Sequence, residues 1–186
     1  LWHGLCDMLA YEIANGGQVS IINRLDRETS GVVLVAKNAA WARLFGLAMQ
    51  NRQIHKTYSA LVHGSPAWDE IDLEAPILRA GDVRECDIWV KQTVHADGAH
   101  CRTGFRVLRR FGDAFTLVEA RPETGRMHQI RVHLQHLGLP MVGDKLYGRD
   151  DRCDLEFIET GWTPALAKRL LIPRQALHSW RLELRS

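Results

Sequence analysis

The sequence lacks the patterns that would hold a metal, a disulfide framework or a nucleotide cofactor. Its four cysteines (Cys6, Cys86, Cys101 and Cys153) are scattered without a Cys-x-x-Cys pair, which argues against a zinc knuckle and a disulfide scaffold. There is no Gly-x-Gly-x-x-Gly fingerprint and no Gly-Lys-Ser/Thr phosphate loop. No apolar run is long enough to cross a membrane, and no cleavable signal pattern, internal repeat or low-complexity stretch is present. We therefore expect reduced thiols and a cytoplasmic location.

What is present is ordinary for one globular domain. The 186 residues suffice for an adequate core, with 46% hydrophobic and 25% charged residues. The net charge of +2 is weak support for a nucleic-acid partner. The segment from residue 168 to the end is more suggestive, because it carries five Lys or Arg residues against one acid, Glu183. This segment is either a stripe that follows RNA phosphates or a solvated face, and the residues alone favour the solvated face.

Apolar patterns predict strands and helices in an irregular order. An apolar run predicts a buried strand over residues 32–36, and a stripe of Trp41, Leu44, Leu47 and Ala48 predicts a helix over residues 39–50. Helices are also expected at 5–13 and at 126–137, the second ending at Gly138. Further strands are expected at 57–62 (Tyr58, Ala60 and Val62 on one face), 102–108, 115–120 and 176–184 (Ala176, Trp180, Leu182 and Leu184 on one face), with an exposed hairpin or loop at 82–99. Because strands cluster in hairpins and helices do not alternate with them, the pattern favours an α+β fold over a doubly wound sheet.

One polar run is more informative than the rest of the chain. Asn23-Arg24-Leu25-Asp26-Arg27-Glu28-Thr29-Ser30-Gly31 places one carboxylate between two arginines, directly before the apolar residues 32–36. A carboxylate on a turn at the start of a strand is held in place, and neighbouring guanidinium groups favour its ionised form. Such a group could act as a nucleophile or base toward a negatively charged substrate. A surface turn with local ion pairs is the commoner explanation, and the run alone does not exclude it.

Four ordered blocks and a closing strand make the sequence resemble the RNA pseudouridine synthases of the RluA type (RsuA/RluA superfamily). The blocks are Arg-Leu-Asp-Arg-Glu-Thr-Ser-Gly at 24–31, Lys-Thr-Tyr-Ser-Ala-Leu-Val-His-Gly at 56–64, Thr-Gly-Arg-Met-His-Gln-Ile-Arg-Val-His at 124–133 and Gly-Asp-Lys-Leu-Tyr-Gly at 143–148. Residues 175–182 resemble the family's closing strand. The similarity runs from about residue 21 to residue 184. Asn23 stands where the family usually has His, and since Asn also donates and accepts hydrogen bonds we expect the change to be tolerated.

The resemblance implies a fold, a reaction and a domain organisation. The expected fold is a curved, mostly antiparallel mixed β-sheet with flanking helices and a central cleft. The expected reaction is the cofactor-free isomerisation of uridine to pseudouridine in RNA. The family's upstream Lys-Pro-x-Gly strand is not found, so the sequence is either a fragment or lacks that edge of the sheet. We expect one catalytic domain over residues 1–186, without a separate S4-type RNA-binding domain.

The resemblance assigns the chemistry to three residues. Asp26 occupies the position of the family's catalytic aspartate, whose carboxylate can attack the sugar carbon, stabilise a cation-like sugar or take a proton from it. The sequence leaves these routes open. Arg131 occupies the position of the arginine that pairs with this aspartate, and we expect a bidentate pair. Tyr58 matches the active-site tyrosine, whose ring can stack on uracil and whose hydroxyl can reach the sugar or Asp26, although a strand tyrosine is otherwise a core residue.

Five further residues are candidates for binding the RNA. The target base must be extruded from folded RNA, and Arg24 matches the position whose arginine enters the vacated space. Arg27, Lys56 and Arg126 are candidates for contacts with the RNA backbone. His128 completes the set. For it, as for His133 and His136 of the same predicted helix, we expect a hydrogen bond to loop backbone or to an RNA phosphate.

No metal is expected. His128, His133 and His136 lie on one predicted helix, where His133 and His136 could share a face, but no carboxylate or cysteine completes a ligand set. We therefore expect a monomeric enzyme without cofactor, acting on ribosomal or transfer RNA and not on a membrane. Two other classes stay open: an inactive RNA-binding module of the same fold, and a metal-dependent nuclease. The ion pair expected between Asp26 and Arg131 favours the enzyme, because a pure binder would not need it.

Overall fold

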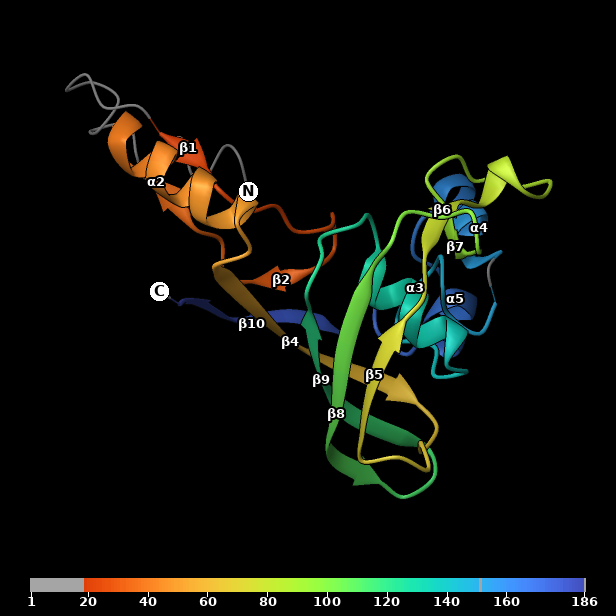
Figure 1. Ribbon diagram of the computed structural model, residues 1–186. Helices are drawn as coiled ribbons and strands as arrows, with labels where there is room; N and C mark the ends of the chain where they lie inside the picture. The colour runs from red at the N-terminus through yellow and green to blue at the C-terminus, as the bar shows by residue number, and fades with distance from the viewer. Residues whose placement is uncertain (1–18, 151, 186) are drawn as a thin grey trace.

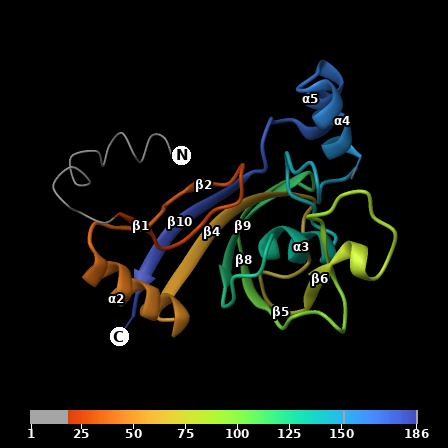
Figure 2. The same ribbon diagram turned by 90° about the horizontal axis from the view of Figure 1, so that it is seen from above.

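The computed structural model describes residues 19–150 and 152–185, and it is built around one strongly curved six-stranded sheet (Figures 1 and 2). The strands lie in the order β2 (Ser30–Gly31), β10 (Leu177–Leu184), β4 (Ile54–His63), β9 (Phe115–Pro122), β8 (Arg102–Phe111) and β5 (Glu70–Glu74). Neighbouring strands are antiparallel except β10 and β2, which are parallel. The predicted hairpin of residues 102–120 is confirmed as β8 and β9.

Two short antiparallel pairs and four α-helices of the described residues complete the architecture. β1 (Ser20–Ile21) pairs with β3 (Val35–Ala36), and β6 (Ile77–Arg79) pairs with β7 (Gln92–Val94) on either side of the 3₁₀ turn η1 (Ala80–Asp82). The helices are α2 (Ala39–Gln50), α3 (Gln129–His136), α4 (Cys153–Thr160) and α5 (Pro164–Leu170). The predicted α+β class and mixed, mostly antiparallel sheet are confirmed. The helix expected at 5–13 lies outside the described residues.

The main core lies between the sheet and α3. Tyr58, Ala60 and Val62 of β4 are buried on one face, as their alternation predicts, and they join Ile130 and Leu134 of α3 in one apolar cluster. Phe105, Val118 and Ala120 of β8 and β9 complete that cluster. Figure 2 shows α3 lying beside the curved sheet. The sheet and α3 therefore form the frame on which the functional side chains are mounted.

The buried strand expected over residues 32–36 is wrong. The chain pairs with β10 at β2, leaves it at Val32, which is 43% exposed, and pairs with β1 only at β3. Asn23 holds this crossing from inside the protein: its Oδ1 accepts from the amide of Leu34 at 2.7 Å and its Nδ2 donates to the carbonyl of Val32 at 3.3 Å. Because this apolar run lies where two sheets meet, no single face of it is buried. Its sequence pattern therefore predicts a longer and more buried strand than the one that forms.

Two apolar stripes are also less buried than their periodicity predicts. The helix over 39–50 is confirmed as α2, but Trp41, Leu44 and Leu47 are each about half exposed and only Ala48 is buried. In β10 the buried residues are Leu177 and Ser179, while Trp180 is 62% exposed. The register of β10 against β4 shifts between Ser179 and Arg181, which breaks the alternation that had placed Trp180 on the inner face.

The helix expected at 126–137 begins three residues later, at Gln129. His128 precedes it with φ 56°, a left-handed conformation that cannot continue a right-handed helix. The side-chain carbonyl of Gln129 accepts from the amide of Arg126 at 3.0 Å and from the hydroxyl of Thr124 at 2.7 Å. The segment 124–128 is therefore a tight turn fastened by its own glutamine. The expected end at Gly138, with φ 73°, is confirmed.

His133 fastens α3 to the strands beneath it. Its Nε2 lies 2.9 Å from the carbonyl oxygen of Ala75 and its Nδ1 lies 2.9 Å from the hydroxyl of Thr103. Because a carbonyl can only accept, Nε2 carries the proton and Nδ1 accepts from Thr103. Burial lowers the pKa of this imidazole, the charge of His136 adds to that effect, and the bond to Ala75 opposes it. The expected hydrogen bond to loop backbone is confirmed for His133.

A substitution at Gly31 tests the junction between β2 and β10. Gly31 has φ +121°, and a Cβ there would lie 2.2 Å from the carbonyl oxygen of Ser179. We expect Gly31→Ala to lower the free energy of unfolding by roughly 2–4 kcal/mol, because the strands must separate and the backbone is strained. Gly112→Ala is the matched control, since Gly112 also has positive φ but nothing lies within 4 Å of its added Cβ. Equal losses of stability in denaturant titrations of the two variants would contradict the steric explanation.

The buried histidine predicts a dependence of stability on pH. The folded pKa of His133 lies below the unfolded value near ~6.5, so the unfolded chain binds more protons, and the free energy of unfolding decreases as pH falls below about 6.5. His63 and His128 shift in the same direction and add to the effect. Denaturant titrations at about pH 7.5 and about pH 5.5 should give a smaller loss on acidification for His133→Gln than for the unmodified protein. An unchanged loss in the variant would contradict this assignment.

Candidate active site

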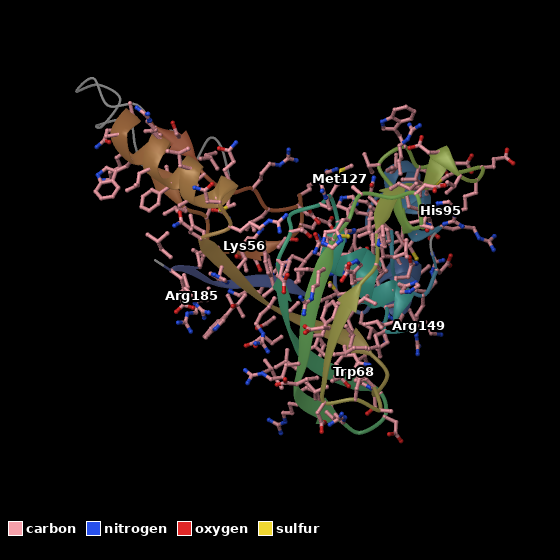
Figure 3. All side chains as sticks on the ribbon, viewed as in Figure 1. Lys56, Trp68, His95, Met127, Arg149 and Arg185 are labelled. Carbon is pink, nitrogen blue, oxygen red and sulfur yellow. The ribbon has the colours of Figure 1, made fainter. Side chains whose placement is uncertain are left out.

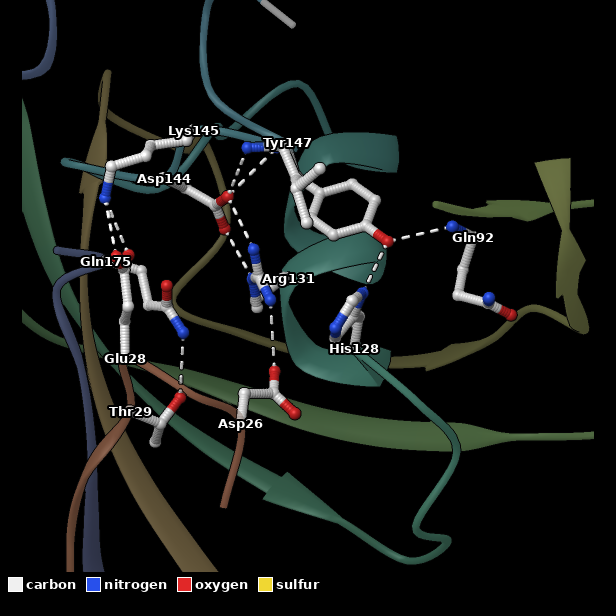
Figure 4. A network of polar contacts seen from close by, with 11 residues as sticks. Asp26, Glu28, Thr29, Gln92, His128, Arg131, Asp144, Lys145, Tyr147 and Gln175 are labelled. Atoms are coloured by element: carbon white, nitrogen blue, oxygen red, sulfur yellow. Dashed lines mark hydrogen bonds and ion pairs between the residues drawn. The ribbon is translucent and has the colours of Figure 1, made fainter. Parts of the chain in front are cut away.

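Asp26 lies on a turn that is fastened on both sides. The turn connects β1 to β2 and closes with a hydrogen bond from the amide of Thr29 to the carbonyl of Asp26, at 3.0 Å. Asn23 fixes the chain before Asp26 through its two bonds to the crossing strand. After Asp26, the side chain of Gln175 donates to the hydroxyl of Thr29 at 3.0 Å (Figure 4). The carboxylate is therefore held from both directions, while its side chain stays 29% exposed.

Arg131 of α3 is the partner of Asp26, across 105 positions of sequence. Its Nη1 donates to Oδ2 of Asp26 at 3.2 Å. The expected pairing is observed, but the expected bidentate geometry is not. The guanidinium fork binds Asp144 instead, with Nε to Oδ2 at 2.7 Å and Nη2 to Oδ1 at 2.8 Å (Figure 4). Two carboxylates thus share one cation, and the buried one takes the fork.

Asp144 is the fully enclosed member of this trio. Its side chain has no exposed surface, and Oδ1 also accepts from the amides of Leu146 at 2.9 Å and Tyr147 at 3.0 Å. Burial by itself disfavours both charged forms, but the paired hydrogen bonds and opposite charges outweigh it. As a result the pKa of Arg131 is raised and the pKa of Asp144 is lowered. Arg131 stays a fixed cation whose direction is set by Asp144.

The residue after Asp144 fastens the Asp26 turn a second time. The ammonium group of Lys145 lies 2.8 Å from both carboxylate oxygens of Glu28 and 2.6 Å from the carbonyl oxygen of Pro173. Lys145 is almost fully buried and also lies over the ring of Phe157 at 4.5 Å. Adjacent residues of one short segment therefore act on both parts of the site: Asp144 orients Arg131, and Lys145 holds Glu28, two positions after Asp26.

These groups open onto a pocket of about 350 Å³ between the Asp26 turn and the beginning of α3. Its lining contains seven of the eight residues that the sequence singled out: Arg24, Asp26, Lys56, Tyr58, Arg126, His128 and Arg131. Arg27 is not part of the lining and is exposed on the turn. Met127, which is labelled in Figure 3, is about half exposed and is also part of the lining. The expected central cleft is this pocket, and it continues past Lys56 and Arg126 into a wider groove of about 960 Å³.

Two β4 side chains form one wall of the pocket. Burial raises the pKa of Tyr58, a hydrogen bond with Ser179 opposes this, and the charge of Asp26 adds to it, so the phenol is neutral at pH 7. Burial lowers the pKa of Lys56. A Cβ on Gly125 would lie 3.3 Å from the ammonium group of Lys56, so the glycine leaves room for that side chain at the edge of the pocket.

The two arginines that flank Asp26 in the sequence are not its partners. Arg24 and Arg27 make no ion pair with Asp26 in the described part of the chain, where Arg131 is its partner. Proximity in the sequence is therefore a poor guide to the partner of this carboxylate. The basic segment near the end is largely paired: Arg169 contacts Asp150 and Glu156, and Arg181 and Arg185 both contact Glu183. These contacts agree with a solvated, ion-paired face.

Sequence reasoning missed the supporting residues Asp144, Lys145 and Tyr147. They lie in the Gly-Asp-Lys-Leu-Tyr-Gly block, which contributes to the family resemblance but for which the sequence analysis predicts no residue role. A signal was available, because an acid and a lysine inside an otherwise apolar stretch are rarely buried without partners. Within residues 19–150 and 152–185, no group of three or more His, Cys, Asp or Glu side chains could hold a metal ion. None of the helices in those ranges is long and apolar enough to span a bilayer.

Sequence comparisons with known proteins point to the same family that the sequence motifs resemble. The sequence matches the RNA pseudouridylate synthase family over residues 4–136. It is 37% identical to the ribosomal large subunit pseudouridine synthase D of Nitrosomonas europaea, over 98% of this chain and 50% of that protein. It is 42% identical to an uncharacterized RNA pseudouridine synthase, YlyB, of Bacillus subtilis, over 69% of this chain and 40% of that protein. The chain thus spans half or less of the length of these curated relatives.

Solved structures give the same result for the fold. The human RNA pseudouridylate synthase domain containing 1 superposes with a TM-score of 0.71 at 27% identity, over 98% of this chain and 69% of that one. The human RNA pseudouridylate synthase domain containing 4 superposes with a TM-score of 0.67 at 28% identity, over 88% of this chain and 66% of that one. With a family match that covers most of the sequence and a shared fold, this chain belongs to the RNA pseudouridylate synthase family.

Proposed function

We propose that this chain carries the catalytic centre of an RNA pseudouridine synthase in which Asp26 acts on the ribose of a flipped uridine. The observation that carries the proposal is the pairing of Asp26 with Arg131 at the wall of a pocket that also contains Tyr58. A carboxylate that is fixed, partly exposed and paired with a single donor is suited to act on a substrate. Family membership supports the reaction type.

The pocket has the size and lining that one extruded nucleotide requires. A volume of about 350 Å³ lies at the lower end of small-molecule sites. Tyr58 offers an aromatic wall for the uracil ring, and stacking on such a ring contributes about 1–3 kcal/mol per base. Arg24, exposed at the rim, enters the space that the base leaves in the RNA. Lys56 and Arg126 contact phosphates where the pocket meets the wider groove.

The reaction needs no co-reactant, because its atoms balance within the uridine. The bond between C1′ and N1 breaks, the base turns, a bond between C1′ and C5 forms, and N1 ends with the proton that C5 loses. Asp26 can attack C1′, stabilise a cation-like sugar or remove a proton from the sugar; each route requires an anionic carboxylate beside the ribose. Arg131 orients this carboxylate through their hydrogen bond while RNA excludes water. Tyr58, neutral at pH 7, contributes stacking and a hydroxyl donor.

Ribosomal RNA is the substrate class that the relatives favour. The matched proteins of Nitrosomonas europaea, Pseudomonas aeruginosa and Vibrio cholerae are named ribosomal large subunit pseudouridine synthases. Mapping pseudouridine in total RNA of cells with and without this protein tests this choice. A missing pseudouridine in large-subunit ribosomal RNA supports it, and one missing from transfer RNA alone overturns it.

An inactive RNA-binding module of the same fold is the alternative. A binder needs basic and aromatic side chains but no anion in the pocket, since Asp26 repels phosphate. Here four segments of the chain, around residues 26, 131, 144 and 175, hold that anion in place. The carboxylate and its supports favour catalysis.

Replacing Asp26 should abolish activity without unfolding the protein. Asp26→Ala and Asp26→Asn should form no detectable pseudouridine in cellular RNA that the unmodified protein converts, because the side chain acting on the ribose is gone. Tritium release from labelled uridine in the RNA, or sequencing of pseudouridine adducts, measures this. Asp113→Asn, in the exposed turn between β8 and β9, is the matched control and should keep full activity. Conversion that persists in Asp26→Ala would refute the assignment.

Arg131→Lys should impair turnover more than RNA binding. A lysine keeps the charge but lacks the planar fork, so it cannot bind Asp144 in two places and still reach Asp26. We expect kcat to fall by roughly 10²-fold, the loss that follows a misplacement of about 1 Å in a reacting group. Single-turnover kinetics with a filter-binding assay for RNA affinity separates the two effects. A loss confined to affinity would contradict the positioning role.

A further inference from the structure

A chain of hydrogen bonds behind the pocket ends at His128. The hydroxyl of Tyr147 lies 2.8 Å from the backbone amide of Gln92 on one side and 2.8 Å from Nδ1 of His128 on the other (Figure 4). Tyr147 has no exposed surface, and its ring lies edge-on to the imidazole at 5.5 Å between centroids. The phenol thus joins the β6–β7 hairpin to the start of α3.

Counting donors along this chain fixes the proton on the imidazole. The amide of Gln92 can only donate, so the oxygen of Tyr147 accepts there. The hydroxyl hydrogen of Tyr147 then needs an acceptor, and in the described part of the chain Nδ1 of His128 is the one within reach. A buried hydroxyl without an acceptor would cost about 1–3 kcal/mol. Nδ1 is therefore the acceptor, and the proton of neutral His128 sits on Nε2.

The surroundings keep His128 neutral and immobile. Burial lowers its pKa and so does the charge of Arg131, while Asp26 and Asp144 oppose this in part. The residue has φ 56°, a conformation that costs a non-glycine residue energy and persists only where the structure imposes it. Here the imposing contacts are the turn fastened by Gln129 and the bond to Tyr147. The imidazole is thus a donor with a fixed direction.

The donor has no other task in the protein. His128 lines the pocket together with Asp26 and Tyr58, and Nε2 has no hydrogen-bond partner among residues 19–150 and 152–185. We propose that Nε2–H of His128 donates a hydrogen bond to O4 of the flipped uracil and thereby selects uracil over cytosine. The proposal rests on the proposed pseudouridine synthase function and names the group that recognises its substrate.

A fixed donor discriminates because it cannot change its role. Both bases present a carbonyl oxygen at C2. At C4 uracil presents a carbonyl oxygen, whereas cytosine presents an amino group that would face the Nε2 hydrogen donor to donor. A histidine free to change tautomer could serve either base. The hydrogen bond from Tyr147 prevents that change of tautomer. Tyr147 and His128 together therefore recognise a base that presents a carbonyl oxygen at C4.

The tautomer can be measured without any RNA or any activity. Long-range ¹⁵N–¹H correlation spectra of the full chain, at a pH above the pKa of His128, distinguish a proton on Nε2 from one on Nδ1. We expect the Nε2–H form in the unmodified protein. Tyr147→Phe keeps the ring under Arg131 but removes the hydroxyl, and we expect a mixture of both forms in that variant. An Nδ1–H form in the unmodified protein overturns the proposal, and so does an unchanged spectrum in Tyr147→Phe.

A double-mutant cycle that combines His128 variants with RNA analogues tests which uracil oxygen His128 contacts. The RNA carries uridine, 2-thiouridine or 4-thiouridine at the target position, since sulfur is a much weaker acceptor than oxygen. His128→Gln places a side-chain amide donor near the position of Nε2 and should keep most of kcat/KM. His128→Asn tolerates the same backbone conformation but falls short of the pocket, and should lose about tenfold, the equivalent of one hydrogen bond.

The outcomes separate this inference from the function beneath it. With 4-thiouridine, the unmodified protein should drop to the level that His128→Asn shows with uridine, and His128→Asn should lose nothing further. A coupled loss with 2-thiouridine in place of 4-thiouridine overturns the inference, because cytosine shares the C2 carbonyl. Independent losses with both analogues overturn it as well. If Asp26→Ala remained active, the proposed mechanism would fail whatever the tautomer. If the unmodified enzyme is active but its His128 carries the proton on Nδ1, the mechanism stands and this inference alone falls.

Discussion

One guanidinium shared between two carboxylates decides how this site works. Arg131 gives its two-pronged fork to Asp144, which is buried and also accepts two backbone amides, and gives one longer contact of 3.2 Å to Asp26. If Asp26 took the fork, both of its oxygens would be tied up in a closed ion pair, and little of the carboxylate would be left for a substrate. The division leaves one anion as a structural support and the other partly exposed at the pocket. A single positive charge for two negative ones also leaves the trio with a formal excess of one negative charge, suited to stabilising positive charge that develops on a ribose.

The fold supplies these groups from distant parts of the chain. The Asp26 turn lies between two short strands, and the parallel pairing of β2 with β10 brings it next to the segment at 173–175. The segment 144–147 then acts on three neighbours at once: Asp144 aims Arg131, Lys145 holds Glu28, and Tyr147 orients His128. A change in this buried segment is therefore expected to alter several pocket residues together, although none of its three side chains lines the pocket.

The fold class and most of the pocket could be predicted from the sequence, because local patterns and the family resemblance carry that information. The alternation of Tyr58, Ala60 and Val62 predicted a buried strand face correctly, since β4 is central and one side of it is covered by α3. The same reasoning failed for residues 32–36 and for Trp180, where a crossing between sheets and a shift of register change which side is covered. Periodicity shows that a segment has an apolar side but does not show what, if anything, covers it. The division of Arg131 between two acids could not be predicted either, because the residues that compete for one cation lie 13 and 105 positions away.

The central claim is that Asp144, by fixing Arg131, sets the position of Asp26. The most direct test is the single-turnover rate of pseudouridine formation by Asp144→Asn on an RNA that the unmodified protein converts, measured together with RNA affinity and thermal unfolding. The asparagine still accepts from the amides of Leu146 and Tyr147 but presents an amide nitrogen to the guanidinium, so Arg131 should move toward Asp26 and close on it. The account predicts a rate lowered by roughly 10²-fold with RNA affinity unchanged in a folded variant. A folded Asp144→Asn protein whose rate stays within about twofold of the unmodified enzyme would contradict it.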